Sequence, residues 1–150
     1  MNDESARQPL WTPSPERVRA ANITRFKDQV AKAWRIELPD TDALYEFSIA
    51  EREKFWQSVR DFAGLKAATW GSRVLVDGDK MPGAKWFPDA RLNFAENLLS
   101  RRDDADAIVF RGEDRVGRRL SFAQLYDRVS VLARALGAAG VGPGDRVAGY

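Results

Sequence analysis

The chain has 150 residues, of which 44% are hydrophobic and 31% charged, a composition typical of a globular protein with a buried core. Its 24 basic and 22 acidic residues leave a formal net charge of +2 and are interspersed, which argues against the one-sided basic stripe that nucleic acid requires. Cysteine and histidine are absent, which excludes disulfides, thiolate metal sites and the commonest general base.

Membrane and secreted classes are excluded by the same inspection. No apolar run is long enough to cross a bilayer, so neither a transmembrane helix nor a membrane partner is expected. The N-terminus reads MNDESARQPLW, with early acidic residues and no apolar stretch of the kind that a secretory signal needs. Together with the lack of cysteine, these features predict a cytoplasmic location.

The N-terminal part of the chain is expected to be a tail followed by a helix. Residues 1–13 show no hydrophobic period and are predicted to form a flexible tail, with Trp11 pinned onto a neighbouring surface. Ser14 can cap a helix that has Pro15 in its first turn, and this helix is predicted to run to about Trp34. Its expected buried face consists of Ile23, Phe26, Val30 and Ala33.

A second helical region is expected after Pro39, which cannot continue the first helix. Residues 41–47 are predicted to form a short helical turn. Ser48 and Glu51 have the spacing of a capping box, so a longer helix is expected after them, closed by Gly64. Its expected core side chains are Phe55, Val59 and Phe62. The charged residues that alternate along it are interpreted as a solvent face with ion pairs: Glu51, Arg52, Glu53, Lys54, Arg60 and Asp61.

Glycines and prolines loosen the pattern between residues 67 and 88. The one strand predicted there is Val74–Val76, ending at an Asp-Gly turn. Asn93 and Glu96 then have the spacing of a helix cap, which predicts a third helix from Phe94 to about Arg101 that buries Leu98 and Leu99.

A β-hairpin and a long helix are predicted next. Residues 107–110 and 119–120 are the expected strands of the hairpin. Ser121, three residues before Gln124, is expected to cap the helix with a capping box. The apolar stripe of this helix comprises Leu125, Val129, Leu132 and Leu136.

The chain is expected to leave this helix through a glycine-rich turn. Gly140 is predicted to end the helix in a left-handed conformation, and residues 142–145 are predicted to form a turn. A strand is then expected from Arg146 to Ala148. Basic pairs such as Arg101–Arg102 are interpreted as solvated surface.

Local chemistry indicates no active site. The glycines at 137, 140, 142 and 144 resemble a phosphate loop, but they leave a helix and enter a strand, the reverse of a dinucleotide fingerprint. Asp77 and Asp79 resemble the start of a calcium loop, yet Pro88 replaces its bidentate Glu. Ser121 has no histidine to activate it. We therefore predict no catalytic, cofactor-binding or metal-binding residue among the 150.

Two stretches carry a resemblance to a known family. The run LSFAQLYDRVSVLARALGAAGVGPGDRVAGY at residues 120–150 resembles the segment that begins the large domain of AMP-forming acyl-CoA synthetases, in the adenylate-forming superfamily. The run MPGAKWFPDARLNFAENLL at residues 81–99 is similar to the WF-x-x-x-x-LN-x-x-x-N-L signature of acetyl-, propionyl- and acetoacetyl-CoA synthetases. The AENLL run, with PLWTPS at residues 9–14 and NITRF at residues 22–26, most resembles the acetoacetyl-CoA synthetases.

The resemblance implies a ligase that works in two steps. Acetoacetate and ATP give an acyl-adenylate and pyrophosphate, and the CoA thiol then displaces AMP. ATP, Mg²⁺ and CoA are thus the implied substrates and cofactor of the complete enzyme. In that family the phosphate loop, the nucleotide contacts and the catalytic lysine lie further along than Tyr150, so these 150 residues are expected to be inactive and to bind none of these ligands.

The signature positions are expected to hold this region against the rest of its own catalytic domain. They are Trp86, Phe87, Leu92, Asn93 and Asn97. Asn93 and Asn97 have the alternative role of reaching a ligand. Asp89 stands where glycine is frequent in the family, which leaves the turn geometry open.

The predicted fold class is α/β. A flexible tail over residues 1–13 precedes a largely helical extension over 14–105, and the beginning of an AMP-binding domain over 106–150 is expected to be truncated. Two alternatives remain: part of an acetyl- or propionyl-CoA synthetase, and a non-catalytic helical interaction module. The module would melt cooperatively as an isolated chain, whereas an incomplete enzyme would expose its last strand and aggregate.

Overall fold

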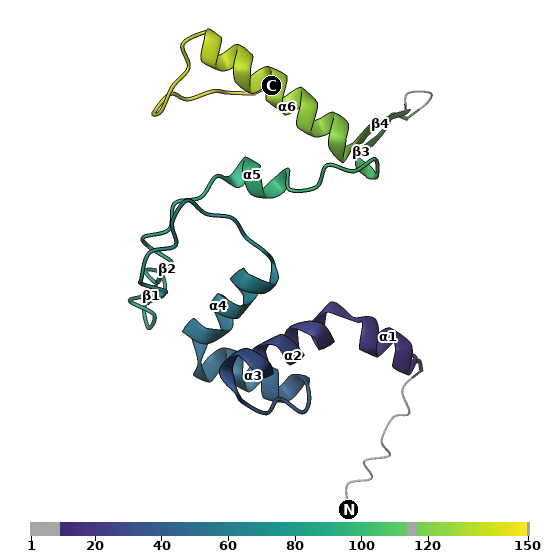
Figure 1. Ribbon diagram of the computed structural model, residues 1–150, viewed down its shortest axis with the longest axis vertical. Helices are drawn as coiled ribbons and strands as arrows, with labels where there is room; N and C mark the ends of the chain where they lie inside the picture. Colours follow the sequence, from purple (N-terminus) through teal and green to yellow (C-terminus); the bar gives the residue numbers. More distant parts are fainter. Residues whose placement is uncertain (1–9, 114–116, 150) are drawn as a thin grey trace, which may run out of the picture. The chain divides into compact units, whose positions relative to one another are not determined.

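The computed structural model describes residues 10–113 and 117–149, which divide into two compact units, Met1–Arg91 and Leu92–Tyr150. The first unit contains helices α1 to α4 and strands β1 and β2, and the second contains α5, β3, β4 and α6 (Figure 1). The chain is mostly helical with two small antiparallel hairpins, which confirms the helical character expected of its N-terminal part. None of the described helices is long and apolar enough to cross a membrane.

The first predicted helix is two helices. Helix α1 (Pro15–Ala20) begins as expected, because the Ser14 hydroxyl accepts a hydrogen bond from the amide of Arg17 at 3.3 Å. Ala21 is extended and separates it from α2 (Asn22–Trp34). The Val18 carbonyl accepts from the Ala21 amide at 3.2 Å and from the Thr24 hydroxyl at 2.6 Å, so the Thr24 side chain bridges the break. Of the expected tail, residues 1–9 lie outside the described part, and residues 10–13 form neither helix nor strand.

The predicted capping box at Ser48 is wrong. Helix α3 (Thr41–Ala50) starts at Asp40, whose carboxylate accepts from the Ala43 amide at 2.8 Å, and it continues through Ser48. The Ser48 hydroxyl donates backwards to the Tyr45 carbonyl at 2.6 Å instead of capping a new helix. Helix α4 (Arg52–Phe62) therefore begins with no side-chain cap. It ends before Gly64, whose φ of +62° confirms the predicted closing residue.

The core of the first unit lies between α2, α3 and α4. Its buried apolar side chains are Phe26, Val30, Leu44 and Phe47, and Val30 is completely inaccessible. Phe55, Val59 and Phe62 of α4 pack against them, as the sequence pattern predicts. At the edge of this core the Trp34 indole donates to the Ser58 hydroxyl at 2.8 Å, and Ser58 donates to the Lys54 carbonyl, so the buried hydroxyl is satisfied. Two residues predicted on the buried face of α2 are exposed instead, namely Ile23 and Ala33.

Residues 69–91 form an irregular hairpin, although only one short strand was expected there. Strands β1 (Leu75–Val76) and β2 (Lys85–Trp86) pair in antiparallel fashion at its centre. At its base Thr69 and Arg91 form an isolated bridge, and the Arg91 amide donates to the Thr69 carbonyl at 2.9 Å. The strands stay short because prolines and left-handed residues interrupt the pairing on either side.

The second unit begins with α5 (Phe94–Leu98), which is shorter than predicted. Its cap is confirmed, because the Asn93 side chain accepts from the Glu96 amide at 3.1 Å. The expected burial of Leu98 is wrong, since that side chain is 61% exposed, and Leu99 is only half-buried. A helix of little more than one turn has too small a face to bury either leucine without a packing partner.

The predicted hairpin and long helix are both present. Strands β3 (Asp106–Arg111) and β4 (Gly117–Ser121) pair in antiparallel register, and part of their turn, residues 114–116, lies outside the described residues. Helix α6 (Phe122–Ala138) starts with the predicted capping box between Ser121 and Gln124. Within its apolar stripe, Leu132 is exposed.

The predicted strand at residues 146–148 does not form. Gly140 is left-handed as expected, with a φ of +86°, and the turn at 142–145 is closed by a hydrogen bond from the Asp145 amide to the Gly142 carbonyl at 3.1 Å. Beyond it the described residues 145–149 have no assigned secondary structure. A strand needs hydrogen-bonding groups on a neighbouring strand, and the described chain offers none here.

The burial of Val30 predicts a matched pair of substitutions. Val30→Ala should lower the free energy of unfolding of the first unit by about 2 kcal/mol, because two methyl groups leave a completely buried site. Val18→Ala deletes the same atoms from a side chain that is 46% exposed and should cost less than about 1 kcal/mol. Urea unfolding followed by tryptophan fluorescence measures both, and equal losses would contradict this core.

Candidate functional site

The Trp-Phe pair of the signature motif packs on helix α4 of its own unit. The Trp86 ring lies 5.7 Å from the Trp56 ring, centroid to centroid. The Phe87 ring lies 5.6 Å from that of Trp70 in an edge arrangement. The Arg60 guanidinium lies over both, 4.9 Å from the Trp70 ring and 5.8 Å from the Phe87 ring. The motif therefore attaches the irregular hairpin to α4.

Arg60 is a residue whose role the sequence pattern did not indicate. Its alternation with acidic neighbours predicts a solvent-facing ion pair, and it does pair with Asp61 at 2.7 Å. The cation–π contacts with rings far along the chain could not be read from helical spacing.

Asp89 stands where glycine is frequent in the family, and the structure shows what its side chain does there. Its carboxylate accepts two hydrogen bonds from the Arg73 guanidinium, one from Nε at 2.8 Å and one from Nη2. The hydrogen bond from Arg73 holds the pKa of Asp89 below its usual value and raises that of Arg73. The carboxylate thus joins the two arms of the irregular hairpin, which is a structural role.

The two asparagines of the motif serve the helix that they begin. Asn93 caps α5, and the Asn97 side-chain amide donates to the Asn93 carbonyl at 2.9 Å. These contacts favour the capping role over a ligand contact. Leu92, by contrast, is 51% exposed and remains available for docking.

The glycine-rich turn after α6 is organised by a side chain rather than by a ligand. The Gly142 amide donates to the Asp145 carboxylate at 2.7 Å, and Gly144 has a φ of +95°, which a residue with a side chain rarely adopts. One of the amides that a phosphate would need is therefore already bound. This supports the structural interpretation of these glycines.

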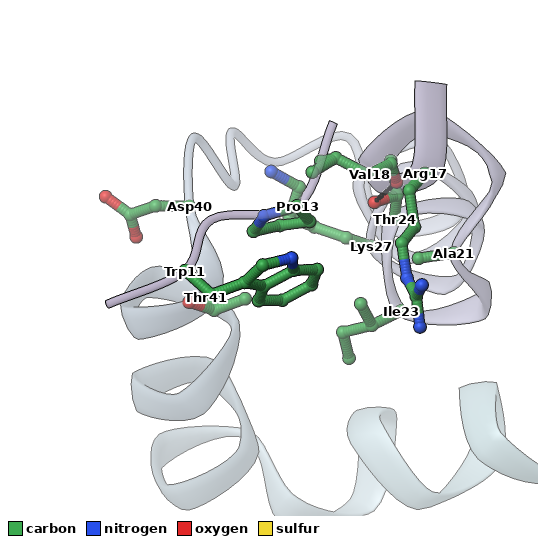
Figure 2. A pocket seen from close by; sticks show the side chains of 10 residues that line it. All are labelled: Trp11, Pro13, Arg17, Val18, Ala21, Ile23, Thr24, Lys27, Asp40 and Thr41. Carbon is green, nitrogen blue, oxygen red and sulfur yellow. Dashed lines mark hydrogen bonds between the residues drawn. The ribbon is translucent and has the colours of Figure 1, made fainter. Parts of the chain in front are cut away.

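A groove of about 510 Å³ lies in the first unit, where the start of the described chain passes α1, α2 and the beginning of α3 (Figure 2). The Trp11 indole projects into it, and the Arg17 guanidinium lies 5.6 Å from the centre of that ring. This contact accords with the expectation that Trp11 pins the tail onto a neighbouring surface. The residues that line the groove are Trp11, Pro13, Arg17, Val18, Ala21, Ile23, Thr24, Lys27, Asp40 and Thr41.

The polar side chains of this groove are engaged in holding the backbone. The Lys27 ammonium donates to the Pro39 carbonyl at 2.8 Å, Asp40 caps α3, and the Thr24 hydroxyl bonds across the break between α1 and α2. These contacts hold together the junction of three helices at which the groove lies.

Acidic residues do not gather into a metal site in the part of the chain that the structure describes. Asp77, from the sequence that resembles a calcium loop, forms an ion pair with Lys80 at 3.0 Å. The absence of catalytic, cofactor-binding and metal-binding residues stays a prediction.

Comparison with known proteins identifies the class to which these features belong. The family model described as the acetyl-coenzyme A synthetase N-terminus matches residues 41–98, a range that includes α3, α4, the irregular hairpin and α5. The chain thus carries the N-terminal region of an acyl-CoA synthetase. An acetyl-coenzyme A synthetase of Streptomyces avermitilis is 38% identical to it over 73% of this chain and 17% of its own length.

Acetoacetyl-CoA synthetases match over more of the chain. The enzyme of Rhizobium meliloti is 43% identical across 95% of this chain, which covers 22% of that relative. The solved structure of acetoacetyl-CoA synthetase from Streptomyces lividans superposes with a TM-score of 0.78 at 39% identity, over 95% of this chain and 23% of its own. The chain therefore corresponds to the N-terminal region of acetoacetyl-CoA synthetases. It spans about a fifth of the length of these relatives.

The close approach of Gly71 to Asp89 predicts that alanine substitution lowers the free energy of unfolding more at Gly71 than at Gly64. A Cβ at Gly71 would lie 2.2 Å from the Asp89 Cβ, whereas nothing lies within 4 Å of one at Gly64, and their φ angles are +66° and +62°. Gly64→Ala should cost about 1–2 kcal/mol from backbone strain alone. Gly71→Ala should cost at least about 1 kcal/mol more. Urea unfolding measures both, and equal costs would contradict the close approach.

The Arg73–Asp89 pair predicts a pH-dependent contribution to stability. Because the folded pKa of Asp89 is lowered, its contribution is present above the unfolded pKa, near 4, and is lost as pH falls through the lower folded value. Thermal melts should therefore show the wild type above Asp89→Asn at pH 7, with the difference shrinking at pH 3. In an Arg73→Gln background the same substitution should have little effect at either pH, and a full effect there would refute the pairing.

Proposed function

We propose that this chain forms the N-terminal region of an acetoacetate–CoA ligase. The observation that carries the proposal is the 43% identity with an acetoacetyl-coenzyme A synthetase across 95% of the chain, supported by the 0.78 TM-score to a solved enzyme of that name. Within the proposed enzyme, residues 1–13 are a tail, 14–105 an extension, and 106–150 the beginning of an α/β AMP-binding domain.

The proposed reaction joins acetoacetate to CoA at the expense of ATP. A carboxylate oxygen of acetoacetate attacks the α-phosphorus of ATP, forming acetoacetyl-adenylate and releasing pyrophosphate. The CoA thiol then adds to the activated acyl carbon, and AMP leaves with the oxygen that it carries. We assign acetoacetate, ATP and CoA as the small-molecule partners of the complete enzyme, with no nucleic acid or membrane involved.

In this proposal the catalytic and nucleotide-binding residues lie in the polypeptide that follows Tyr150. The described residues do not fit Mg²⁺, because no three of their acidic side chains gather at one place. The relatives are more than four times as long as the matched region, which leaves room for the phosphate loop and the lysine. A cytoplasmic location is part of this proposal, supported by the lack of cysteine in the sequence.

A second candidate is a ligase for acetate or propionate. The observation that favours it is the 38% identity with an acetyl-coenzyme A synthetase. That match covers 73% of the chain rather than 95%, so acetoacetate remains the preferred substrate.

The proposal predicts a substrate preference in the complete polypeptide. With ATP, Mg²⁺ and CoA present, pyrophosphate and AMP should form with acetoacetate, and kcat/KM should exceed that for acetate and for propionate by at least about tenfold. A preference for either competing acid would overturn the assignment of acetoacetate. The 150 residues alone, assayed in parallel, should release no pyrophosphate, and release by that region would refute the assignment of its chemistry to the downstream chain.

A further inference from the structure

The groove at the junction of α1, α2 and the start of α3 carries an exposed apolar surface. Three of the side chains that line this α1–α2 groove are large, apolar and exposed, namely Trp11, Val18 and Ile23. Leu10, which precedes Trp11, is fully exposed as well. Apolar side chains that gather on a surface among polar ones are typical of an interaction site.

A second exposed apolar surface is the outward face of α3. Leu44 and Phe47 of this helix are buried in the core of the first unit. Residues at i, i+3, i+4 and i+7 share one face of a helix, and on the face opposite these two they are Asp42, Tyr45, Glu46 and Ile49. Tyr45 is 63% exposed and Ile49 is 52% exposed. An amphipathic helix with two apolar anchors four residues apart can bind in an apolar groove.

The two surfaces carry opposite charge. Residues 15–34, which form α1 and α2, contain five basic and two acidic side chains, whereas residues 40–50 contain three acidic and no basic ones. Arg17, Asp42 and Glu46 form no ion pair with another residue that the structure describes. The groove is therefore apolar and basic, and the outward face of α3 is apolar and acidic. Such complementary potentials favour association and set its orientation.

We propose that the complete polypeptide forms a two-fold dimer in which α3 of each copy lies in the α1–α2 groove of the other. Tyr45 and Ile49 are the apolar anchors of this contact, and Asp42 and Glu46 face the basic side chains of the groove. This assembly is independent of the acyl substrate, so it goes beyond the proposed function.

The position of the groove on the first unit explains why the assembly is a closed dimer. Asp40 and Thr41, at the start of α3, line the groove, so the groove and the helix that binds to its counterpart adjoin each other (Figure 2). When both surfaces of one copy lie side by side, a single two-fold axis can form both contacts at once. The assembly then closes at two copies instead of growing as a filament.

A matched pair of lysine substitutions tests the interface. Ile49 is 52% exposed and belongs to the outward face of α3, whereas Leu65 is 46% exposed and belongs to neither surface. Both side chains are exposed, so neither substitution should unfold the first unit. Sedimentation velocity on the complete polypeptide, at concentrations up to about 100 μM, measures the dimer dissociation constant. Ile49→Lys should raise this constant at least about tenfold, and Leu65→Lys should change it less than about twofold.

Two results of this experiment would overturn the proposal. The first is a complete polypeptide that stays monomeric at every concentration, because α3 would then be covered by its own chain or by solvent. The second is a dimer that Ile49→Lys and Leu65→Lys weaken equally, because the contact would then lie elsewhere. The measurement needs no substrate, so a negative result leaves the proposed ligase activity untouched.

Exchanging the charges tests the complementarity separately. Arg17→Glu in the groove and Glu46→Arg on α3 should each weaken the dimer at least about fivefold, because each change brings like charges together. The double variant should recover to within about threefold of the wild type, since each reversed surface then meets a reversed partner. The loss in the single variants should shrink when NaCl is raised from about 50 to about 500 mM. A double variant weaker than both single variants would refute the opposite-charge contact.

Discussion

The edge-to-face packing of Phe26 is the contact on which the first unit depends. Its ring lies 5.7 Å from that of Phe55 and 5.2 Å from that of Phe62, so one side chain of α2 holds α4 at two points about two turns apart. Helix α4 in turn carries the irregular hairpin through Trp56 and Arg60. The Phe26 contacts therefore help to fix the helix on which the signature motif packs.

This dependence explains what the signature motif contributes. Trp86 packs against Trp56 of α4, and Phe87 packs against Trp70. Asp89 joins the two arms of the irregular hairpin through its ion pair with Arg73. These contacts lie within the first unit, and acetyl- and acetoacetyl-CoA synthetases both match the chain. The motif is therefore a mark of the architecture of the N-terminal region. Substrate choice belongs, in the proposed enzyme, to residues further along.

The helix signals show how far local sequence carries a prediction. Ser14 and Ser121 cap the helices expected of them because each follows an extended segment and precedes a helix with no competing start. Ser48 has equally good spacing, but the cap at Asp40 starts α3 earlier and includes Ser48 in its interior. The break at Ala21 is a second case that local sequence did not predict. The apolar spacing continues across it, and the Thr24 hydroxyl bridges it with a hydrogen bond to the Val18 carbonyl. Candidate caps compete, and spacing alone does not rank them.

The sequence by itself determined the core positions Phe26 and Val30 of α2, the packing face of α4, the β3–β4 hairpin, the capping box of α6 and the resemblance to acyl-CoA synthetases. These depend on periodicity, capping spacing and turn residues, which act over a few residues. Only the tertiary structure decided that Arg60 stacks on Trp70 and Phe87, and that Arg101 and Arg102, which are exposed as expected, also lie over the rings of Phe122 and Tyr126. It also left Leu132 exposed and residues 146–148 unpaired. Stacking, burial and strand pairing each need a partner whose position in space no local pattern specifies.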